Sequence, residues 1–174
     1  MPAAGTRPTS DRVREALFSR LEHAGLIAGA RVLDLYAGSG ALGLEAASRG
    51  AGGVVLVESA RDAAQVCRRN AAKLGLDAQV VNRRVQAFLT DTVATADLVF
   101  LDPPYDTTED DLGGVLDALT AHLAADAVVV VERSVRNGEP RWPVGLVRTD
   151  QRRYGETVLW FAEVGPAEVG PAES

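Results

Sequence analysis

Short apolar runs alternate with helical patterns along most of this 174-residue sequence. The apolar runs have the length of buried strands and lie at residues 31–36, 54–57, 78–81, 97–101 and 127–131. The helical patterns between them lie at residues 41–49, 60–74, 85–90 and 109–123. Strands that alternate with helices form parallel sheets joined by right-handed crossovers, and continuously apolar strands need cover on both faces. The sequence therefore predicts an α/β fold with a mostly parallel sheet.

The two ends of the chain add further elements to this core. Ser10 or Asp11 can cap a helix over residues 9–25, with Gly25 at its end. Residues 145–161 have the pattern of two strands around a turn, which predicts an antiparallel hairpin. Residues 162–174 repeat Ala-Glu-Val-Gly-Pro and have no core-forming pattern. We expect one domain over residues 1–161 and a low-complexity tail over residues 162–174.

Composition and charge exclude several classes of protein. No apolar run approaches the ~20 residues that cross a bilayer, and residues 1–10 do not resemble a signal peptide, so we expect a cytoplasmic protein without a membrane partner. The only cysteine, Cys67, is expected to be a small core residue, and no metal site is indicated.

The net charge of −6 argues weakly against a general nucleic-acid binder. However, the basic residues are almost all arginine, which suits phosphate contacts, and they cluster near both ends of the domain: Arg7, Arg12, Arg14 and Arg20, then Arg148, Arg152 and Arg153.

A glycine-rich turn follows the first predicted strand, over Asp34-Leu35-Tyr36-Ala37-Gly38-Ser39-Gly40. Glycine allows a sharp turn and a close approach of a ligand to the backbone, at the sheet edge where open α/β sheets bind ligands. Together with Gly43, the spacing also matches a dinucleotide fingerprint, which alone is a weak signal. Glu58 ends the second strand, where a carboxylate can accept hydrogen bonds from the ribose of S-adenosylmethionine (SAM) or of NAD.

Asp102-Pro103-Pro104-Tyr105 directly follows the fourth predicted strand and favours SAM over NAD. The prolines fix the backbone and supply only carbonyl acceptors. An amine with two N–H donors can be held by a carboxylate and a proline carbonyl, with its lone pair directed at an electrophilic methyl group. Tyr105 can stack on the face of a base. We therefore expect a SAM-dependent methyltransferase that modifies an exocyclic amino group of a nucleic-acid base.

These motifs, with the opening Arg7-Pro8-Thr9-Ser10-Asp11-Arg12-Val13-Arg14 and with Tyr154-Gly155-Glu156-Thr157, resemble the RsmD family of bacterial 16S rRNA guanine-N2 methyltransferases. The resemblance runs from about Arg7 to Phe161. It implies a Rossmann-like, seven-stranded methyltransferase fold, SAM as donor with S-adenosylhomocysteine (SAH) as product, and guanine N2 of 16S rRNA as acceptor. The implied partner is 16S rRNA in an assembling 30S subunit, with ribosomal proteins as further contacts and a monomeric enzyme.

The resemblance also assigns roles to particular residues. At the target base it places Asp102, Pro103, Pro104 and Tyr105. The predicted cofactor residues are Asp34, Tyr36, Ala37, Gly38, Ser39, Gly40, Glu58, Ser59, Val85 and Asp102. The predicted RNA-binding residues are Arg7, Thr9, Arg12, Arg152 and Arg153.

Two departures from that family stand out. Family members usually begin with a basic β-hairpin, whereas six residues precede Arg7 here, so we expect that hairpin to be absent. The loop after the third strand, Asn82-Arg83-Arg84-Val85-Gln86, lacks the acid that often contacts adenine, which leaves the backbone N–H of Val85 for that contact. Three alternatives remain open: adenine-N6 or another amino-methyltransferase, an NAD-binding oxidoreductase, and a non-catalytic RNA-binding module.

Overall fold

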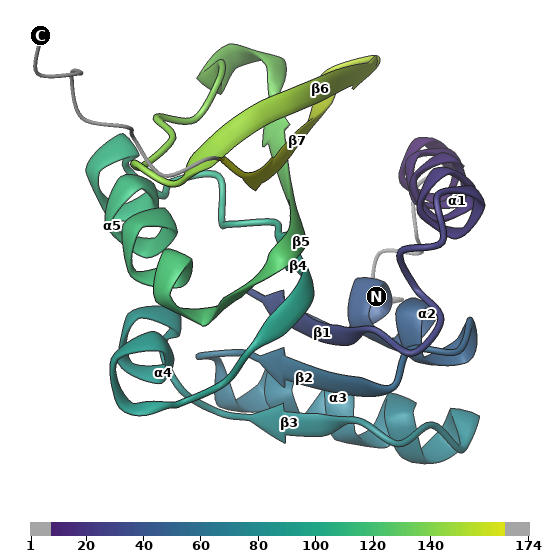
Figure 1. Cartoon of the computed structure of the whole chain (residues 1–174). Helices are drawn as coiled ribbons and strands as arrows, with labels where there is room; N and C mark the ends of the chain where they lie inside the picture. Colours follow the sequence, from purple (N-terminus) through teal and green to yellow (C-terminus); the bar gives the residue numbers. More distant parts are fainter. Residues whose placement is uncertain (1–7, 166–174) are drawn as a thin grey trace, which may run out of the picture.

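The computed structural model describes the backbone of residues 8–165 and the side chains of residues 10–165. Within this range seven strands form one sheet in the order β3-β2-β1-β4-β5-β7-β6 (Figure 1). The strands are β1 (Arg31–Leu35), β2 (Gly53–Val57), β3 (Gln79–Val81), β4 (Ala96–Leu101), β5 (Leu123–Ser134), β6 (Leu146–Tyr154) and β7 (Thr157–Val164). The helices are α1 (Pro8–His23), α2 (Ala41–Ser48), α3 (Arg61–Leu74), α4 (Val85–Asp91) and α5 (Glu109–Leu119), with short 3-10 turns at Thr120–His122 and Val135–Asn137.

The pairing confirms the predicted mixture of parallel and antiparallel strands. β1 pairs in parallel with β2 and β4, and the parallel pairs β2·β3 and β4·β5 extend the sheet on both sides. β7 pairs antiparallel with both β5 and β6, which is the predicted terminal hairpin. The fold is thus the predicted Rossmann-like, seven-stranded sheet with a C-terminal antiparallel hairpin.

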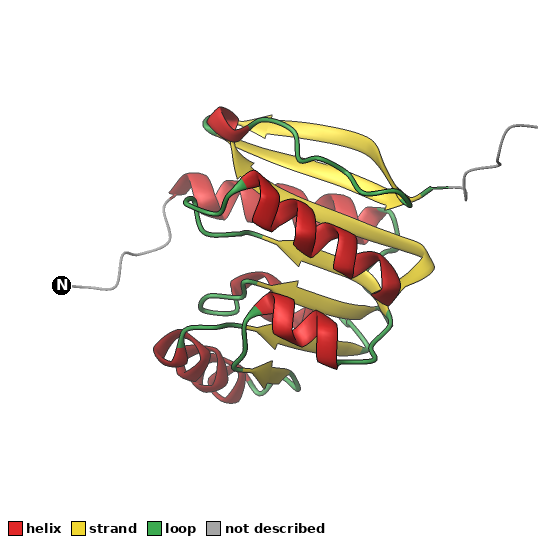
Figure 2. Ribbon diagram, turned by 90° about the vertical axis from the view of Figure 1, so that its left-hand side faces the viewer, coloured by secondary structure: helices red, strands yellow, loops and turns green. Residues whose placement is uncertain are grey.

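Helices cover both faces of the sheet (Figures 1 and 2). On one face α1, α2 and α3 pack on residues such as Phe100 and Leu56, and on the other α4 and α5 pack on residues such as Val99 and Leu101. The alternation of these side chains between two apolar clusters explains why the central strands are apolar throughout.

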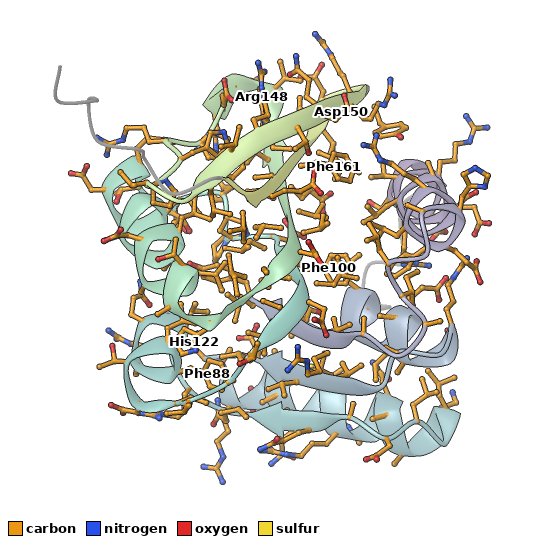
Figure 3. The ribbon with its side chains drawn as sticks, in the orientation of Figure 1. Phe88, Phe100, His122, Arg148, Asp150 and Phe161 are labelled. Carbon is orange, nitrogen blue, oxygen red and sulfur yellow. The ribbon has the colours of Figure 1, made fainter. Side chains whose placement is uncertain are left out.

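α1 is held against the sheet by aromatic and charged contacts. Phe18 packs on Phe100 with ring centroids 5.6 Å apart. The Arg20 guanidinium lies 3.9 Å above the Phe161 ring and donates to Asp150 at 2.6 Å. Figure 3 shows Phe100 and Phe161 projecting from the sheet on the side of α1. Arg20 therefore links the helix to β6 and β7 and is not available as a free phosphate ligand.

Several element boundaries differ from the sequence prediction. The predicted helix 109–123 ends at Leu119. The residues that follow are held by His122, whose two ring nitrogens lie within hydrogen-bonding distance of the carbonyls of Leu89 and Ala94. The fifth strand continues to Ser134, beyond the predicted end at residue 131, because β7 pairs with Glu132, Arg133 and Ser134 after β4 has ended.

β7 itself runs to Val164, three residues into the segment predicted as tail, because Ala162 is buried in the sheet opposite Val129. The rest of the predicted tail, residues 166–174, lies outside the described residues.

Candidate functional site

A cleft of about 590 Å³ opens at the carboxyl ends of β1, β2 and β4. It is lined by Asp34, Tyr36, Ala37, Gly38, Ser39, Ala41, Leu42, Glu58, Ser59, Arg84, Val85, Gln86, Asp102 and Pro104. The glycine turn after β1 and the Asp-Pro-Pro corner after β4 therefore share one cleft. Its volume is within the ~300–1,000 Å³ of small-molecule and cofactor sites.

The glycine turn adopts backbone angles that other residues rarely do. Gly38 has φ 58° and Gly40, which precedes α2, has φ 87°. Gly43 is needed for a different reason, because a Cβ there would lie 2.2 Å from Leu56 Cδ2 and 3.1 Å from Asp34 Cβ. The Gly43 N–H donates to Asp34 Oδ2 at 2.9 Å. The first turn of α2 is thus pressed directly onto the end of β1.

Side chains from α3 fix the outer part of this turn. Cys67 Sγ lies 2.9 Å from the Gly38 carbonyl and Asn70 Nδ2 donates to the Ser39 carbonyl at 3.0 Å. Cys67 is fully buried, as predicted for a core residue, and burial raises its thiol pKa to about 11. It therefore stays protonated at neutral pH and supports the turn without acting as a nucleophile.

Glu58 joins the second strand to the glycine turn. Its Oε1 accepts the Gly38 N–H at 2.9 Å and its Oε2 accepts the Ala60 N–H at 2.7 Å. Asn82, from the loop after β3, donates to the carbonyls of Glu58 and Ser59 at 2.9 and 3.0 Å. An ionised carboxylate has about four lone-pair sites, so two remain on Glu58 for a ligand with adjacent hydroxyl groups.

The cleft is acidic. Asp34 is buried, and burial raises its pKa to about 7 against the opposing hydrogen bond from Gly43, with the charges of Asp102 and Glu58 adding to the rise. Desolvation by its neighbours also raises the pKa of Asp102, although this residue is exposed at the edge of the cleft. Within residues 10–165, no arginine or lysine forms an ion pair with these three carboxyl groups. Carboxylates gathered in this way favour a positively charged ligand.

The loop after β3 contributes the far wall of the cleft. Arg84, Val85 and Gln86 all line it, and Val85 is the first residue of α4. Val85 therefore lies at the cleft, and the contact of its backbone with adenine stays a prediction. Gln86 adds an exposed amide that the sequence analysis did not single out.

A second pocket, of about 420 Å³, adjoins the cleft and shares Asp102 and Pro104 with it. Pro103 and Tyr105 line this pocket, and Tyr105 is 92% exposed. Its other wall contains Glu132 and Arg133 at the end of β5 and Glu156 in the β6–β7 turn. Asp102 therefore stands at the boundary between a cofactor-sized cleft and a pocket that is open enough for a planar ring.

Glu132 is a residue that the sequence analysis missed. It directly follows the apolar run 128–131, as Asp102 follows 98–101 and Glu58 follows 54–57. This repeated position after an apolar run was the sequence signal that could have identified Glu132. Its carboxyl group lies within hydrogen-bonding reach of Asp102.

The predicted RNA-binding residues are only partly described by the structure. Arg7 and the side chain of Thr9 lie outside the described residues. Arg12 is exposed on α1, and Arg152 and Arg153 are exposed on β6. Arg152 lies 3.4 Å from Asp150, and Arg153 donates to the Gly155 carbonyl at 3.0 Å. These three arginines are exposed at the surface, and none of them lines the cleft or the pocket beside it.

Two further observations concern the described residues. They contain no group of three or more His, Cys, Asp or Glu side chains arranged to hold a metal ion. Among the same residues, every helix is too short or too polar to span a lipid bilayer.

Known proteins resemble this chain in sequence and in structure. A relative from Escherichia coli (strain K12), named ribosomal RNA small subunit methyltransferase D, is 43% identical over 142 residues, which are 80% of this chain and 70% of the relative. A Bacillus subtilis (strain 168) protein named "Putative rRNA methyltransferase YlbH" is 34% identical over 87% of this chain and 84% of its own length. The solved structure of "Putative methyltransferase yhhF from Escherichia coli" superposes with a TM-score of 0.82 and 35% identity, over 92% of this chain and 90% of that one.

A sequence model of one protein family, described as "Conserved hypothetical protein 95", matches residues 1–163, which is nearly the whole chain. The match includes the glycine turn, Glu58, the Asp-Pro-Pro-Tyr corner and the terminal hairpin, and it agrees with the resemblance found in the motifs. The chain therefore belongs to the Conserved hypothetical protein 95 family, the family of ribosomal RNA small subunit methyltransferase D.

Proposed function

We propose that this protein transfers a methyl group from SAM to the exocyclic N2 of a guanine in 16S rRNA. The observation that carries the proposal is the shared cleft, in which the glycine turn and Glu58 lie on one side and Asp102 and Pro104 on the other. The names of the relatives support rRNA of the small subunit as the substrate.

The residues of the cleft fit SAM. Glu58 has acceptor sites left for the two ribose hydroxyls, and the exposed backbone around Gly38 and Ser39 offers room for the methionine part. The acidic character given by Asp34, Glu58 and Asp102 suits the positive sulfonium. When bound, SAM supplies a methyl group that is already electrophilic. The chain then has mainly to position the acceptor, an effect worth roughly 7–11 kcal/mol in favourable cases.

Asp102 and the Pro103 and Pro104 carbonyls would hold the two N–H donors of the amine, and Tyr105 would stack on the base. Bound SAM would supply the methyl group to the acceptor nitrogen and would leave as SAH, with the electron pair of the broken carbon–sulfur bond on sulfur. One N–H proton then passes to a carboxylate oxygen of Asp102. No covalent enzyme intermediate is needed, which agrees with the protonated state of Cys67.

The base has to leave its stack to reach the second pocket, which favours an exposed or distorted rRNA segment. Arg12, Arg152 and Arg153, with Arg7 and Thr9, are the proposed phosphate contacts. With a net charge of −6 the protein gains little from general attraction to RNA. We therefore propose that its substrate is an assembling 30S subunit. We also propose that the protein is a cytoplasmic monomer.

Replacement of Asp102 tests this assignment. Asp102→Ala is expected to lower the rate of methyl transfer by at least ~100-fold, with SAH affinity, measured by calorimetry, close to that of the wild type. Asp106→Ala removes an exposed carboxylate four residues along the same loop and serves as the matched control. Full activity of Asp102→Ala would contradict the role of Asp102, and calorimetric binding of NAD in place of SAH would favour the oxidoreductase alternative.

A further inference from the structure

The end of β5 brings a second carboxyl group to Asp102. In the parallel β4–β5 pair Leu101 stands opposite Val131, so Asp102 and Glu132 follow at neighbouring positions. β4 ends there, whereas Glu132 is still held in the sheet by its pairing with Leu159 of β7. Glu132 is therefore a fixed strand residue beside the loop residue Asp102, and both line the second pocket.

Two carboxyl groups in contact share a proton, because ionising both in a confined site is costly. Glu132 is the partner that retains it. Burial and the neighbouring Asp102 raise the pKa of Glu132 to about 8. The hydrogen bond from Glu132 acts in the opposite direction on Asp102 and partly offsets the rise of its pKa on desolvation. Glu132, whose pKa lies above neutral, is thus the hydrogen-bond donor of the pair, and an oxygen of Asp102 is the acceptor.

No other charged group around the pair takes the place of the Glu132 proton between the two carboxyl groups. Arg133, the next residue of β5, is bound to Glu109 of α5 and to the Gly138 carbonyl. Asp34 approaches from β1 and Glu156 from the β6–β7 turn, and both are acids that would oppose a second negative charge. Tyr105, the remaining titratable group of the pocket, is exposed on the Asp-Pro-Pro loop.

From this juxtaposition we infer that Glu132 is a positioning residue, whose protonated carboxyl group holds one oxygen of Asp102 and leaves the other free to accept an N–H of the target amine. The inference rests on the proposed function, since it concerns how Asp102 is presented to the acceptor. The loop that carries Asp102 has two prolines but no strand partner beyond Leu101. The hydrogen bond from a residue fixed in the sheet supplies the missing constraint.

The inference predicts a specific pH dependence. As the pH rises through about 8, Glu132 loses its proton, the two carboxylates repel one another and Asp102 loses its orientation. The rate of methyl transfer therefore falls on the alkaline side. Glutamine at position 132 can still donate a hydrogen bond to Asp102 but does not titrate, so Glu132→Gln removes this alkaline loss. Ionisation of the RNA base affects all variants alike and cancels in the comparison.

The experiment measures single-turnover methyl transfer between about pH 6 and pH 10 for the wild type, Glu132→Gln, Glu132→Ala and Asp126→Asn. Asp126 is an exposed acid at the other end of β5 and is the matched control. We expect Glu132→Gln to keep the neutral rate within ~3-fold and to lose the decline near pH 8. We expect Glu132→Ala to lower the neutral rate ~10- to 100-fold, with the RNA KM and the SAH affinity nearly unchanged.

An alkaline decline in Glu132→Gln equal to that of the wild type would overturn the inference, and so would a wild-type rate in folded Glu132→Ala. If Glu132→Ala does not fold, the near-isosteric Glu132→Gln decides alone. Inactivity of Asp102→Ala together with normal behaviour of both Glu132 variants would overturn the inference and leave the proposed function intact. Activity of Asp102→Ala would instead overturn the proposed site.

Discussion

Glu58 permits the most quantitative prediction, because each of its oxygens already accepts one backbone hydrogen bond, from Gly38 at 2.9 Å and from Ala60 at 2.7 Å. If the two remaining acceptor sites bind the ribose hydroxyls, Glu58→Ala removes two charge-assisted hydrogen bonds to the cofactor. Hydrogen bonds to charged groups contribute ≈ 1.5–3 kcal/mol each. The smaller value for both bonds gives about 3 kcal/mol, which corresponds to a loss of SAH affinity of about 100-fold.

The same substitution also affects stability. It leaves the N–H groups of Gly38 and Ala60 to water, which costs roughly 1 kcal/mol each, the net value of an ordinary hydrogen bond. Glu58→Gln should be intermediate for both properties, because its amide keeps one acceptor oxygen but turns an NH₂ group toward a backbone N–H. Asp62→Asn, which removes a charge from an exposed side chain in the first turn of α3, should change neither.

Calorimetric titration with SAH measures the affinities, and urea unfolding shows whether each variant is folded at the temperature of the titration. SAH affinity of folded Glu58→Ala within about 3-fold of the wild type would refute the ribose assignment. A loss of affinity that Asp62→Asn reproduces would refute the geometric argument as well, because it would indicate a general effect of charge.

Three further predictions follow from the same cleft. Because burial raises the Asp34 pKa to about 7, the folded state binds a proton that the unfolded chain releases near pH 4, so the free energy of unfolding should decrease between about pH 4 and pH 7. Asp34→Asn should remove that decrease, and an unchanged pH slope in urea unfolding would count against it. Gly43→Ala, whose Cβ would lie 2.2 Å from Leu56 Cδ2, should lower stability by about 1–3 kcal/mol; a wild-type unfolding midpoint would disprove the close packing. Tyr105→Ala should raise the RNA KM and leave the unfolding midpoint unchanged, because the side chain is 92% exposed, whereas Tyr105→Phe should retain the wild-type KM; equal KM values for all three proteins would argue against stacking.

Local patterns predict most of this fold, because each central strand is a self-contained apolar run. The parallel direction of β1 to β5 was predictable from the alternation of elements, and the antiparallel hairpin from the turn at Tyr154-Gly155-Glu156. The ends of β5 and β7 were not, because they depend on pairing between strands that are distant in the sequence. The extension of β5 to Ser134 exists only because β7 continues beside it.

The site likewise contains residues that local patterns predict and residues whose position depends on pairing between distant strands. Glu58 and Asp102 each follow an apolar run in the sequence, and Asp34 interrupts such a run just before the glycine turn. The structure places all three on one cleft. The proximity of Glu132 to Asp102 depends on the register between β4 and β5, which no local pattern specifies. Arg20 illustrates the opposite error, because membership of a basic cluster suggested a phosphate contact, while its guanidinium is engaged by Phe161 and Asp150.

The most direct test of the account is transfer of labelled methyl groups from SAM to small ribosomal subunits that lack the modification, followed by identification of the labelled nucleoside by mass spectrometry. Naked 16S rRNA and the Asp102→Ala variant serve as parallel reactions. We expect N2-methylguanosine in the small-subunit rRNA, and no product with Asp102→Ala. Label in N6-methyladenosine would support a different amino-methyltransferase, and SAM binding without transfer to any small-subunit substrate would contradict the proposed reaction.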